Sequence, residues 1–212
     1  LRRYAPIIYG PTALFTLGQG AVVPLIPLIA IDLGANIATA ALVAAAIVLG
    51  QVLGDLPAGA IAARFGERVT MVLSGTLALL GVAGMALASH LLLFAISVFF
   101  VGLCTASFGI ARHAFMTRRV PFHFRARSLS LLGGVYRFGV FLGPFIGAAA
   151  DKISGDNRTV CWWFVLCVIG AVLLVWLGPD PERVAEGTLP ATTTGQAQAK
   201  SLGVMRTVMQ HR

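Results

Sequence analysis

Three charged residues stand within apolar stretches of the sequence, where charged side chains are rare and usually functional. Asp55 is the only one of the eight acidic residues that lies well inside such a stretch, and Arg112 and Arg137 are the corresponding bases. A charge at the centre of a membrane helix costs about 2.5–3.5 kcal/mol, so these side chains are expected to face the bundle interior, water or one another. Asp55 therefore serves either in an ion pair that fixes or gates helix packing, or as a carboxylate that takes up and releases a proton.

Uncharged polar residues add further candidates. Gln19 and Gln51 lie within apolar stretches and are candidates to line a cavity, the alternative being a hydrogen bond to a neighbouring helix. His90, His113 and His123 fall close to the ends of apolar runs. An imidazole in that position is expected to lie at the membrane interface rather than to bind a ligand.

The sequence gives no sign of enzymatic chemistry. It contains no Ser/His/acid set on a plausible turn, no paired carboxylates and no phosphate-binding loop. Its three cysteines, Cys104, Cys161 and Cys167, lack the spacing of a metal site and are expected to pack as small buried thiols. We expect no catalytic residues, no metal and no cofactor, so that an ion gradient would supply the energy for any transport.

The stretches that hold these residues have the composition of membrane-spanning helices. Hydrophobic residues make up 58% of the 212 residues and charged residues 11%, and the mean hydropathy is +0.87. A membrane helix needs about 20 mostly apolar residues, and such runs recur along the chain. They are Ala5–Ile31, Ile37–Ala63, Val69–Ala88, Leu91–Met116, Leu129–Ala150 and Val160–Leu177. Because the ten-residue alternation of a β-barrel is absent, the prediction is an all-helical membrane protein with six transmembrane helices.

The basic residues are distributed unevenly between the ends of these runs. If each run crosses once, nine arginines fall on one side and two basic residues on the other. The nine are Arg2, Arg3, Arg64, Arg68, Arg118, Arg119, Arg125, Arg127 and Arg183, and the two are Lys152 and Arg158. This bias predicts that both termini are cytoplasmic. It also explains the net charge of +8 through lipid headgroups, so the lipid bilayer is an expected partner and nucleic acid is not.

The chain changes character after the sixth run. Residues 1–178 form the predicted six-helix bundle, and residues 179–200 are rich in Pro, Gly, Thr and Gln, which predicts a flexible cytoplasmic linker. Residues 201–212 fit the start of an amphipathic helix that Ser201 can cap. The sequence begins without Met, and we expect it to be part of a longer protein whose second half follows.

Small residues recur at helix-packing spacing in two of the runs. Gly50, Gly54 and Ala58 follow one another every four residues in the second run, and Gly139, Gly143 and Gly147 do so in the fifth. This spacing predicts close approach of helix backbones. Each run also contains a proline expected to bend the helix, Pro57 and Pro144. The offset of three runs is typical of the 3+3 repeat of a transporter half.

With these motifs the sequence resembles the major facilitator superfamily, in particular its drug/proton antiporter-like branch. Gly59, Arg64, Gly66 and Arg68 fit the family's hinge motif between the second and third helices, and Gly139, Gly143, Pro144 and Gly147 fit its antiporter motif in the fifth helix. The stretch "VVPLIPLIAIDLGAN" looks like the family's Pro-x-x-Pro helix end. The resemblance implies a transporter of two six-helix halves that binds substrate between them and works by alternating access. This chain would be the N-terminal half, and the C-terminal half would be its partner.

The hinge departs from the family pattern at two positions. The family's acid falls on Ala63, and one of its basic positions falls on Glu67. Glu67 therefore supplies either a shifted acid for a contact between the halves or part of a plain solvated hinge. The turn itself needs a residue that tolerates positive φ, which Gly66 provides, and Arg64 and Arg68 suit the carbonyl end of the preceding helix.

Two functions from different classes fit these features. The first is half of a proton-coupled secondary transporter in the cell (inner or plasma) membrane, an antiporter that exports a small amphipathic compound. The second is a non-transporting membrane scaffold or interaction subunit, in which six helices suffice and the arginines only orient them.

Overall fold

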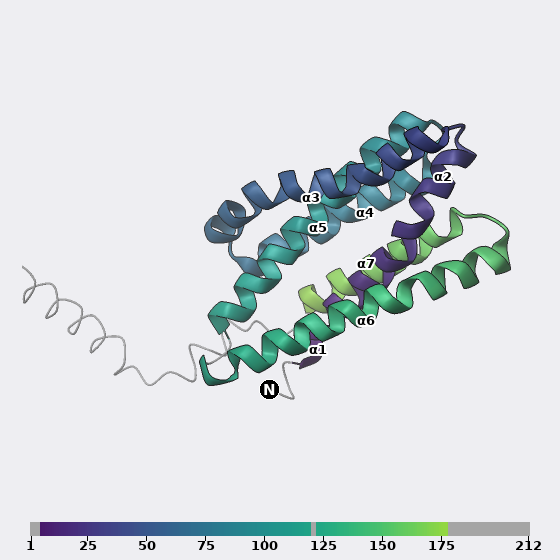
Figure 1. Ribbon diagram of the computed structural model, residues 1–212. Coiled ribbons are helices and arrows are strands. Elements are labelled where there is room, and N and C mark those ends of the chain that lie inside the picture. Colours follow the sequence, from purple (N-terminus) through teal and green to yellow (C-terminus); the bar gives the residue numbers. More distant parts are fainter. Residues whose placement is uncertain (1–4, 120–121, 178–212) are drawn as a thin grey trace, which may run out of the picture. The chain divides into compact units, whose positions relative to one another are not determined.

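The computed structural model describes residues 5–119 and 122–177, in which every regular element is a helix (Figure 1). These elements are α1 (Ala5–Val22), the 3₁₀ turn η1 (Val23–Leu25), α2 (Ile26–Asp32), α3 (Ile37–Phe65), α4 (Glu67–Leu87), α5 (Leu91–Arg119), α6 (Phe122–Ser154) and α7 (Thr159–Leu177). The predicted linker at 179–200 and the predicted amphipathic helix at 201–212 lie outside the described residues.

Six helical segments in the described ranges are long and apolar enough to cross a membrane, which confirms the six predicted spans. The boundaries differ most around the basic stretch between the fourth and fifth spans. There α5 continues to Arg119 and α6 begins at Phe122, seven residues earlier than the predicted start at Leu129. Arginine is a good helix former with a long aliphatic stem, so a basic segment can stay helical as it passes from the apolar layer toward the headgroups.

The first span is interrupted, which a single helix from Ala5 to Ile31 did not predict. Pro24 stands in the first turn of η1, and Pro27 stands in the first turn of α2. Each proline lacks the amide hydrogen that an α-helix interior needs, so the chain takes one 3₁₀ turn between two α-helical pieces. The predicted Pro-x-x-Pro helix end is thus a break within the span, after which α2 adds seven residues.

Short connections join the helices at both ends of the bundle. Asn36 caps α3, because its Oδ1 accepts a hydrogen bond from the Thr39 amide at 2.8 Å. At the other end of α3 the chain turns within one residue, Gly66, whose φ is +85°. The prediction of a positive φ at Gly66 is confirmed, and this single residue sets α3 and α4 antiparallel with almost no loop.

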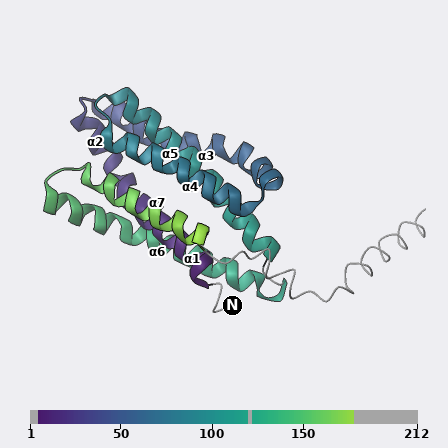
Figure 2. The same ribbon diagram turned by 180° about the vertical axis from the view of Figure 1, so that it is seen from behind.

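The helices pack as two groups of three (Figures 1 and 2). One group is α3, α4 and α5, and the other is α1, α6 and α7. The most extensive helix contacts are α3 with α5 and α1 with α6, followed by α4 with α5 and α1 with α7. If each span is exchanged for the span three places along the chain, the α3–α5 contact becomes the α6–α1 contact. In the same exchange, the α4–α5 contact becomes the α7–α1 contact. The packing therefore has the internal symmetry of a 3+3 repeat.

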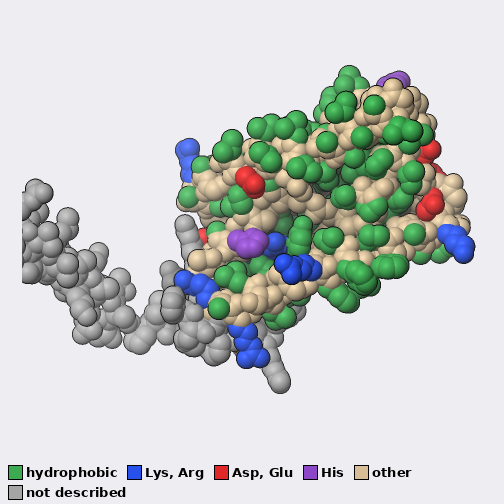
Figure 3. All heavy atoms as spheres, viewed as in Figure 1, with side chains coloured by type: hydrophobic (Ala, Val, Ile, Leu, Met, Phe, Trp, Pro, Cys, Tyr) green, Lys and Arg blue, Asp and Glu red, His purple; other side chains and the backbone are tan. Residues whose placement is uncertain are grey.

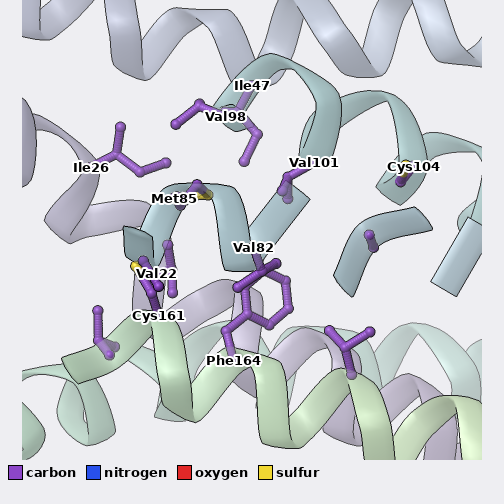
Figure 4. Packing of buried hydrophobic residues seen from close by; sticks show 14 of the residues in the cluster. Val22, Ile26, Ile47, Val82, Met85, Val98, Val101, Cys104, Cys161 and Phe164 are labelled. Carbon is purple, nitrogen blue, oxygen red and sulfur yellow. The ribbon is translucent and has the colours of Figure 1, made fainter. Parts of the chain in front are cut away.

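Hydrophobic side chains from both groups fill the core between them (Figure 4). Val82 of α4, Val101 of α5 and Phe164 of α7 lie in this core with Val22 and Ile26 of the first span. The three cysteines are buried and free, as expected for packing residues. Residues of the described ranges form no cluster of three or more His, Cys, Asp or Glu side chains that suits a metal ion.

The glycines of the second and fifth spans bring backbones into direct contact, as their spacing predicted. A Cβ atom on Gly54 would lie 2.6 Å from the carbonyl oxygen of Leu103 in α5. A Cβ atom on Gly147 would lie 2.7 Å from the carbonyl oxygen of Ala21 in α1. Contacts this short leave room for a hydrogen atom only, so glycine sets the α3–α5 and α1–α6 distances. Both α3 and α6 stay helical through Pro57 and Pro144, and the predicted bend there remains a prediction.

Gly143→Ala should destabilise the protein because its methyl group would meet the backbone of Gly20 and Ala21. Overpacking of this kind costs about 1–3 kcal/mol. Gly134→Ala is the matched control on the same helix, since a Cβ atom there meets nothing within 4 Å. The control should be neutral or stabilising by about 0.5–1 kcal/mol. Thermal unfolding of the two purified variants in detergent tests the difference, and equal melting temperatures would show that α6 does not rely on this contact.

Candidate functional site

A cavity of about 570 Å³ opens between the two groups of helices. Four helices line it, α1, α3, α5 and α6, whereas α4 and α7 contribute none of its lining residues. Its polar and aromatic lining includes Phe15, Thr16, Gln19, Gln51, Asp55, Thr105, Phe108, Arg112, His113 and Tyr136. In the view of Figure 3, hydrophobic side chains are spread over much of the surface, and acidic, basic and histidine side chains lie toward both ends of the bundle, among them the end where α5 ends and α6 begins.

Helical spacing explains why these residues share a cavity. Phe15 and Gln19 are four residues apart on α1, and so are Gln51 and Asp55 on α3. On α5, Phe108 and Arg112 are also four apart. Residues at this spacing lie one above the other on one face of a helix, so α1, α3 and α5 each present one face with a polar residue to the cavity. The two glutamines predicted as cavity candidates both line it, and their part in binding remains a prediction.

Asp55 lines the cavity with its side chain exposed. Ten residues separate it from the end of α3, which places it about 15 Å inside the helix. Within the described part of the chain, Asp55 makes no hydrogen bond and no ion pair within 4.0 Å. The carboxylate is therefore deep in the span yet open to the cavity.

Arg112 lines the same cavity but is buried, with 7% of its surface exposed. Its guanidinium carbon lies 5.8 Å from the centre of the Tyr136 ring on α6, a distance at which cation and ring attract. No carboxylate of the described ranges lies within 4.0 Å of it, and its Nε has no hydrogen-bond partner there. The two opposite charges thus share a cavity without direct contact, so an Asp55–Arg112 ion pair is not what holds the helices together.

Arg137 does not line the cavity, so of the three surroundings expected for it, the bundle interior, another of these charges or water, the bundle interior is not the one found, and water remains a prediction. Its side chain is exposed, and the cavity-lining residue of α6 is the preceding one, Tyr136. Successive residues on a helix point about 100° apart, so the position of Tyr136 on the cavity does not by itself bring Arg137 to it. The apolar run places Arg137 within a span but does not give the direction of its side chain.

The sequence patterns did not identify several residues of the cavity, or predicted another location for them. His113 was expected at the membrane interface, yet it lines the cavity with its Nδ1 at 2.8 Å from the Gly109 carbonyl oxygen. Phe15 stacks on Phe108 with ring centres 4.8 Å apart and planes 8° apart. An available signal was the repeated four-residue spacing, Phe15 to Gln19 and Phe108 to Arg112, in the first and fourth spans.

The antiporter motif lies directly behind the cavity wall. Gly139 packs against Thr16, and Gly143 packs against Gly20, on either side of the cavity residue Gln19. Pro144 is exposed. The motif therefore sets how close α6 comes to the part of α1 that carries Gln19. A role of this motif in antiport stays a prediction.

The hinge residues form a separate site at one end of the bundle. Arg68 donates hydrogen bonds from Nε to the Val175 carbonyl oxygen at 3.2 Å and from Nη2 to that of Trp176 at 2.8 Å. These carbonyls belong to the last turn of α7, where a cation is favoured by the helix dipole. Glu67, by contrast, is buried with 4% of its surface exposed, in the first turn of α4. A plain solvated hinge is therefore wrong for Glu67, and a contact from it to another half remains a prediction.

Comparison with known proteins gives a family and a fold. The sequence matches the family model described as Major Facilitator Superfamily over residues 11–208. Among solved structures, the chain is similar to the human organic anion transporter MFSD10 (TETRAN), with a TM-score of 0.66 and 16% sequence identity. The match covers 83% of this chain and 47% of that one, so this chain spans about half its length. At this identity the likeness shows the fold alone. No curated protein matches the sequence.

Arg68→Ala should loosen the contact between α4 and α7, because it removes the charged donors from the carbonyls of Val175 and Trp176. We expect a loss of about 1–2 kcal/mol in stability, and a smaller loss for Arg68→Lys, which keeps a cation at the helix end. Arg64→Ala is the control, since Arg64 is exposed and lies only over the Phe65 ring at 5.6 Å. Thermal unfolding in detergent measures all three, and equal losses for Arg64→Ala and Arg68→Ala would contradict the capping role.

Proposed function

The chain belongs to the major facilitator superfamily, and on that premise we propose that it is the N-terminal half of a proton-coupled transporter that exports a small amphipathic compound by alternating access. It is an integral membrane protein with six membrane-capable helices among its described residues. The proposal adds a direction, a coupling ion and a class of substrate to the family.

The observation that carries the proposal is the cavity between the two groups of helices. Its volume of about 570 Å³ is in the range of small-molecule sites. Its lining combines aromatic rings with two glutamines, an acid and a buried arginine, within a bundle whose core is mostly apolar. A scaffold that only orients six helices gains nothing from such a lining, because each polar group in the membrane interior reduces stability unless it is used.

Asp55 is the proposed proton carrier. A carboxylate held in an ion pair keeps its charge, because the neighbouring cation opposes protonation. Asp55 has no such pair within 4.0 Å among the described residues and is exposed on the cavity side, so protonation would break no packing contact. These facts favour the proton-carrying role over the ion pair that the sequence left open.

Two further features support export and the proposed orientation of the bundle in the membrane. The glycines of the antiporter motif pack against α1 beside the cavity, at Thr16 and Gly20, where they can influence which side the cavity opens to. Among the described residues, Arg64, Arg68 and Arg125 lie near the end of the bundle where α3 meets α4. We propose that this end and both termini are cytoplasmic, and that the membrane is the cell (inner or plasma) membrane.

A second half of the same transporter is the proposed partner. The chain covers 47% of the similar solved transporter, and exposed large hydrophobic side chains such as Leu56 and Phe141 lie on helices that also line the cavity. In this proposal the substrate binds between the two halves, and Arg137 and Glu67 are candidates for gating contacts between them.

Asp55→Asn should abolish gradient-driven transport, because the amide cannot carry a proton, while leaving stability unchanged. Uptake into inverted membrane vesicles that contain the full-length protein, with and without a proton uncoupler, measures this. The matched control is Asp151→Asn, an acid on α6 outside the cavity, which should transport normally. Uptake that ignores the uncoupler would exclude proton coupling. Normal uptake by Asp55→Asn with a lowered melting temperature would assign Asp55 to packing, and no uptake by any form would favour the scaffold.

A further inference from the structure

His113 is an exposed imidazole on the cavity, and the backbone determines which of its nitrogens is basic. Its Nδ1 lies 2.8 Å from the carbonyl oxygen of Gly109, one helical turn back on α5. A carbonyl oxygen only accepts, so Nδ1 donates and keeps its proton in both charge states of the ring. Nε2 is therefore the nitrogen that gains and loses a proton, and it has no hydrogen-bond partner among the described residues.

The helices that carry the acid and the imidazole of the cavity, α3 and α5, run in the same direction. A Cβ atom on Gly50 of α3 would meet the backbone of Phe99 in α5, and one on Gly54 would meet that of Leu103. Residue numbers thus rise together along the two helices. Both helices therefore finish at one end of the bundle, the α3–α5 end, where α4 and α6 begin.

His113 lies between Asp55 and the α3–α5 end. Gly54 packs against Leu103 and Ala106, so Asp55, the next residue of α3, is level with that turn of α5. His113 comes seven residues after Ala106, which places it about 10 Å nearer the α3–α5 end. A proton that moves between Asp55 and the solution at this end therefore passes the level of His113.

The cavity follows one face of α5 on both sides of His113. Thr105, Gly109, His113 and Thr117 all line it, and because they are spaced four residues apart they stand in one row. The side chains of His113 and Thr117, the two nearest the α3–α5 end, are exposed. A polar cavity of about 570 Å³ has room for water, and a chain of water molecules can carry a proton over the remaining distance to Asp55.

No charged neighbour holds the imidazole in one charge state. Among the described residues that line the cavity, the other titratable or charged groups are Asp55 of α3, Arg112 of α5 and Tyr136 of α6. No such group comes from α1, and α4 packs against α5 without lining the cavity. No described carboxylate lies within 4.0 Å of His113, and Arg112 is buried beside the Tyr136 ring. Imidazole ordinarily changes charge between about pH 5 and 8, and no described ion pair keeps this one a cation.

We propose that His113 transfers the proton between Asp55 and the solution at the α3–α5 end. Nε2 accepts the proton that Asp55 releases through cavity water, and the same nitrogen then gives it to water at this end. The ring is an imidazolium between the two steps, the proton is the only atom transferred, and the reverse path loads Asp55. Imidazole accepts a proton far more readily than water does, so the transfer is faster than through water alone. This rests on the proposed function, in which Asp55 carries the proton.

Time-resolved infrared spectroscopy of the full-length protein in detergent tests the transfer without a substrate. Photolysis of 2-nitrobenzaldehyde releases protons into the solution, and the carbonyl stretch of protonated Asp55 reports their arrival. Asp55→Asn identifies this band, because the variant lacks it. His113→Ala should slow the appearance of the band about tenfold or more, because only water is left to pass the proton.

Free imidazole should restore the rate in His113→Ala and leave the wild-type rate unchanged, which a merely structural side chain would not allow. His90→Ala is the matched control, because His90 precedes α5 at its other end and does not line the cavity. Its band should appear at the wild-type rate. A wild-type rate in His113→Ala overturns the proposal, and so does a slow rate that imidazole does not restore.

Nitrogen NMR of the isotope-labelled full-length protein tests the geometry of the ring independently of Asp55. At a pH where the ring is neutral, the proton of His113 should reside on Nδ1, and loss of the signal in His113→Ala assigns it. A proton on Nε2 would contradict the proposal, because Nδ1 would then meet the Gly109 carbonyl without a hydrogen atom.

The same measurements separate this inference from the proposed function. If no band of protonated Asp55 appears at any pH, Asp55 is not the proton carrier, and the proposed function and the transfer through His113 fail together. If the band appears at one rate in the wild type and in His113→Ala, the transfer through His113 alone is wrong. A slow, imidazole-restored band in a protein whose vesicle uptake ignores the uncoupler would contradict proton-coupled transport alone.

Discussion

Direct backbone contact between two pairs of helices is the constraint on which the rest of the structure depends. Gly54 brings α3 against α5, and Gly143 and Gly147 bring α6 against α1. The four helices in these pairs are the four that line the cavity. The remaining two, α4 and α7, lie behind them and supply much of the apolar core. The glycines therefore set the width of each wall, and α4 and α7 hold the two walls together.

The same arrangement explains where the chemistry lies. The two pairs are related by an exchange of spans three apart, and the stacked rings of Phe15 and Phe108 come from equivalent spans, the first and the fourth. One helical turn further along the same face come Gln19 and Arg112, respectively. Both line the cavity, and both have an atom without a described hydrogen-bond partner. The internal repeat thus places two unlike polar groups in equivalent positions. Because Arg112 is charged and Gln19 is neutral, the positive charge lies on one side of the stacked rings only.

Sequence patterns predicted the elements well and the contacts between distant residues poorly. Six spans and the turn at Gly66 follow from hydropathy and from the steric needs of a one-residue turn. Hydropathy did not predict that Tyr136 lines the cavity and that its neighbour Arg137 does not. A membrane helix is apolar toward lipid as well as toward protein, so hydropathy gives its depth but not its rotation. The partners of Arg68 lie more than 100 residues away in α7, and no local pattern identifies them.

The buried polar atoms of the cavity that lack a hydrogen-bond partner are also the places where the fold departs from the usual rule that buried polar groups are paired. Elsewhere in the described ranges, hydroxyl groups in the helices donate to the carbonyl one turn back, as Ser74 does to Thr70. Gln19 and Arg112 have no such local solution, because their side chains are too long to return to their own helix turn. Arg112 meets the Tyr136 ring of α6, but no described residue supplies a hydrogen-bond partner for its Nε or for the Gln19 Oε1. Their burial reduces stability, and the glycine contacts and the core have to offset it. Natural sequences retain such exceptions mainly at functional sites, so these two residues mark the cavity as the part of the described bundle where stability gives way to another requirement.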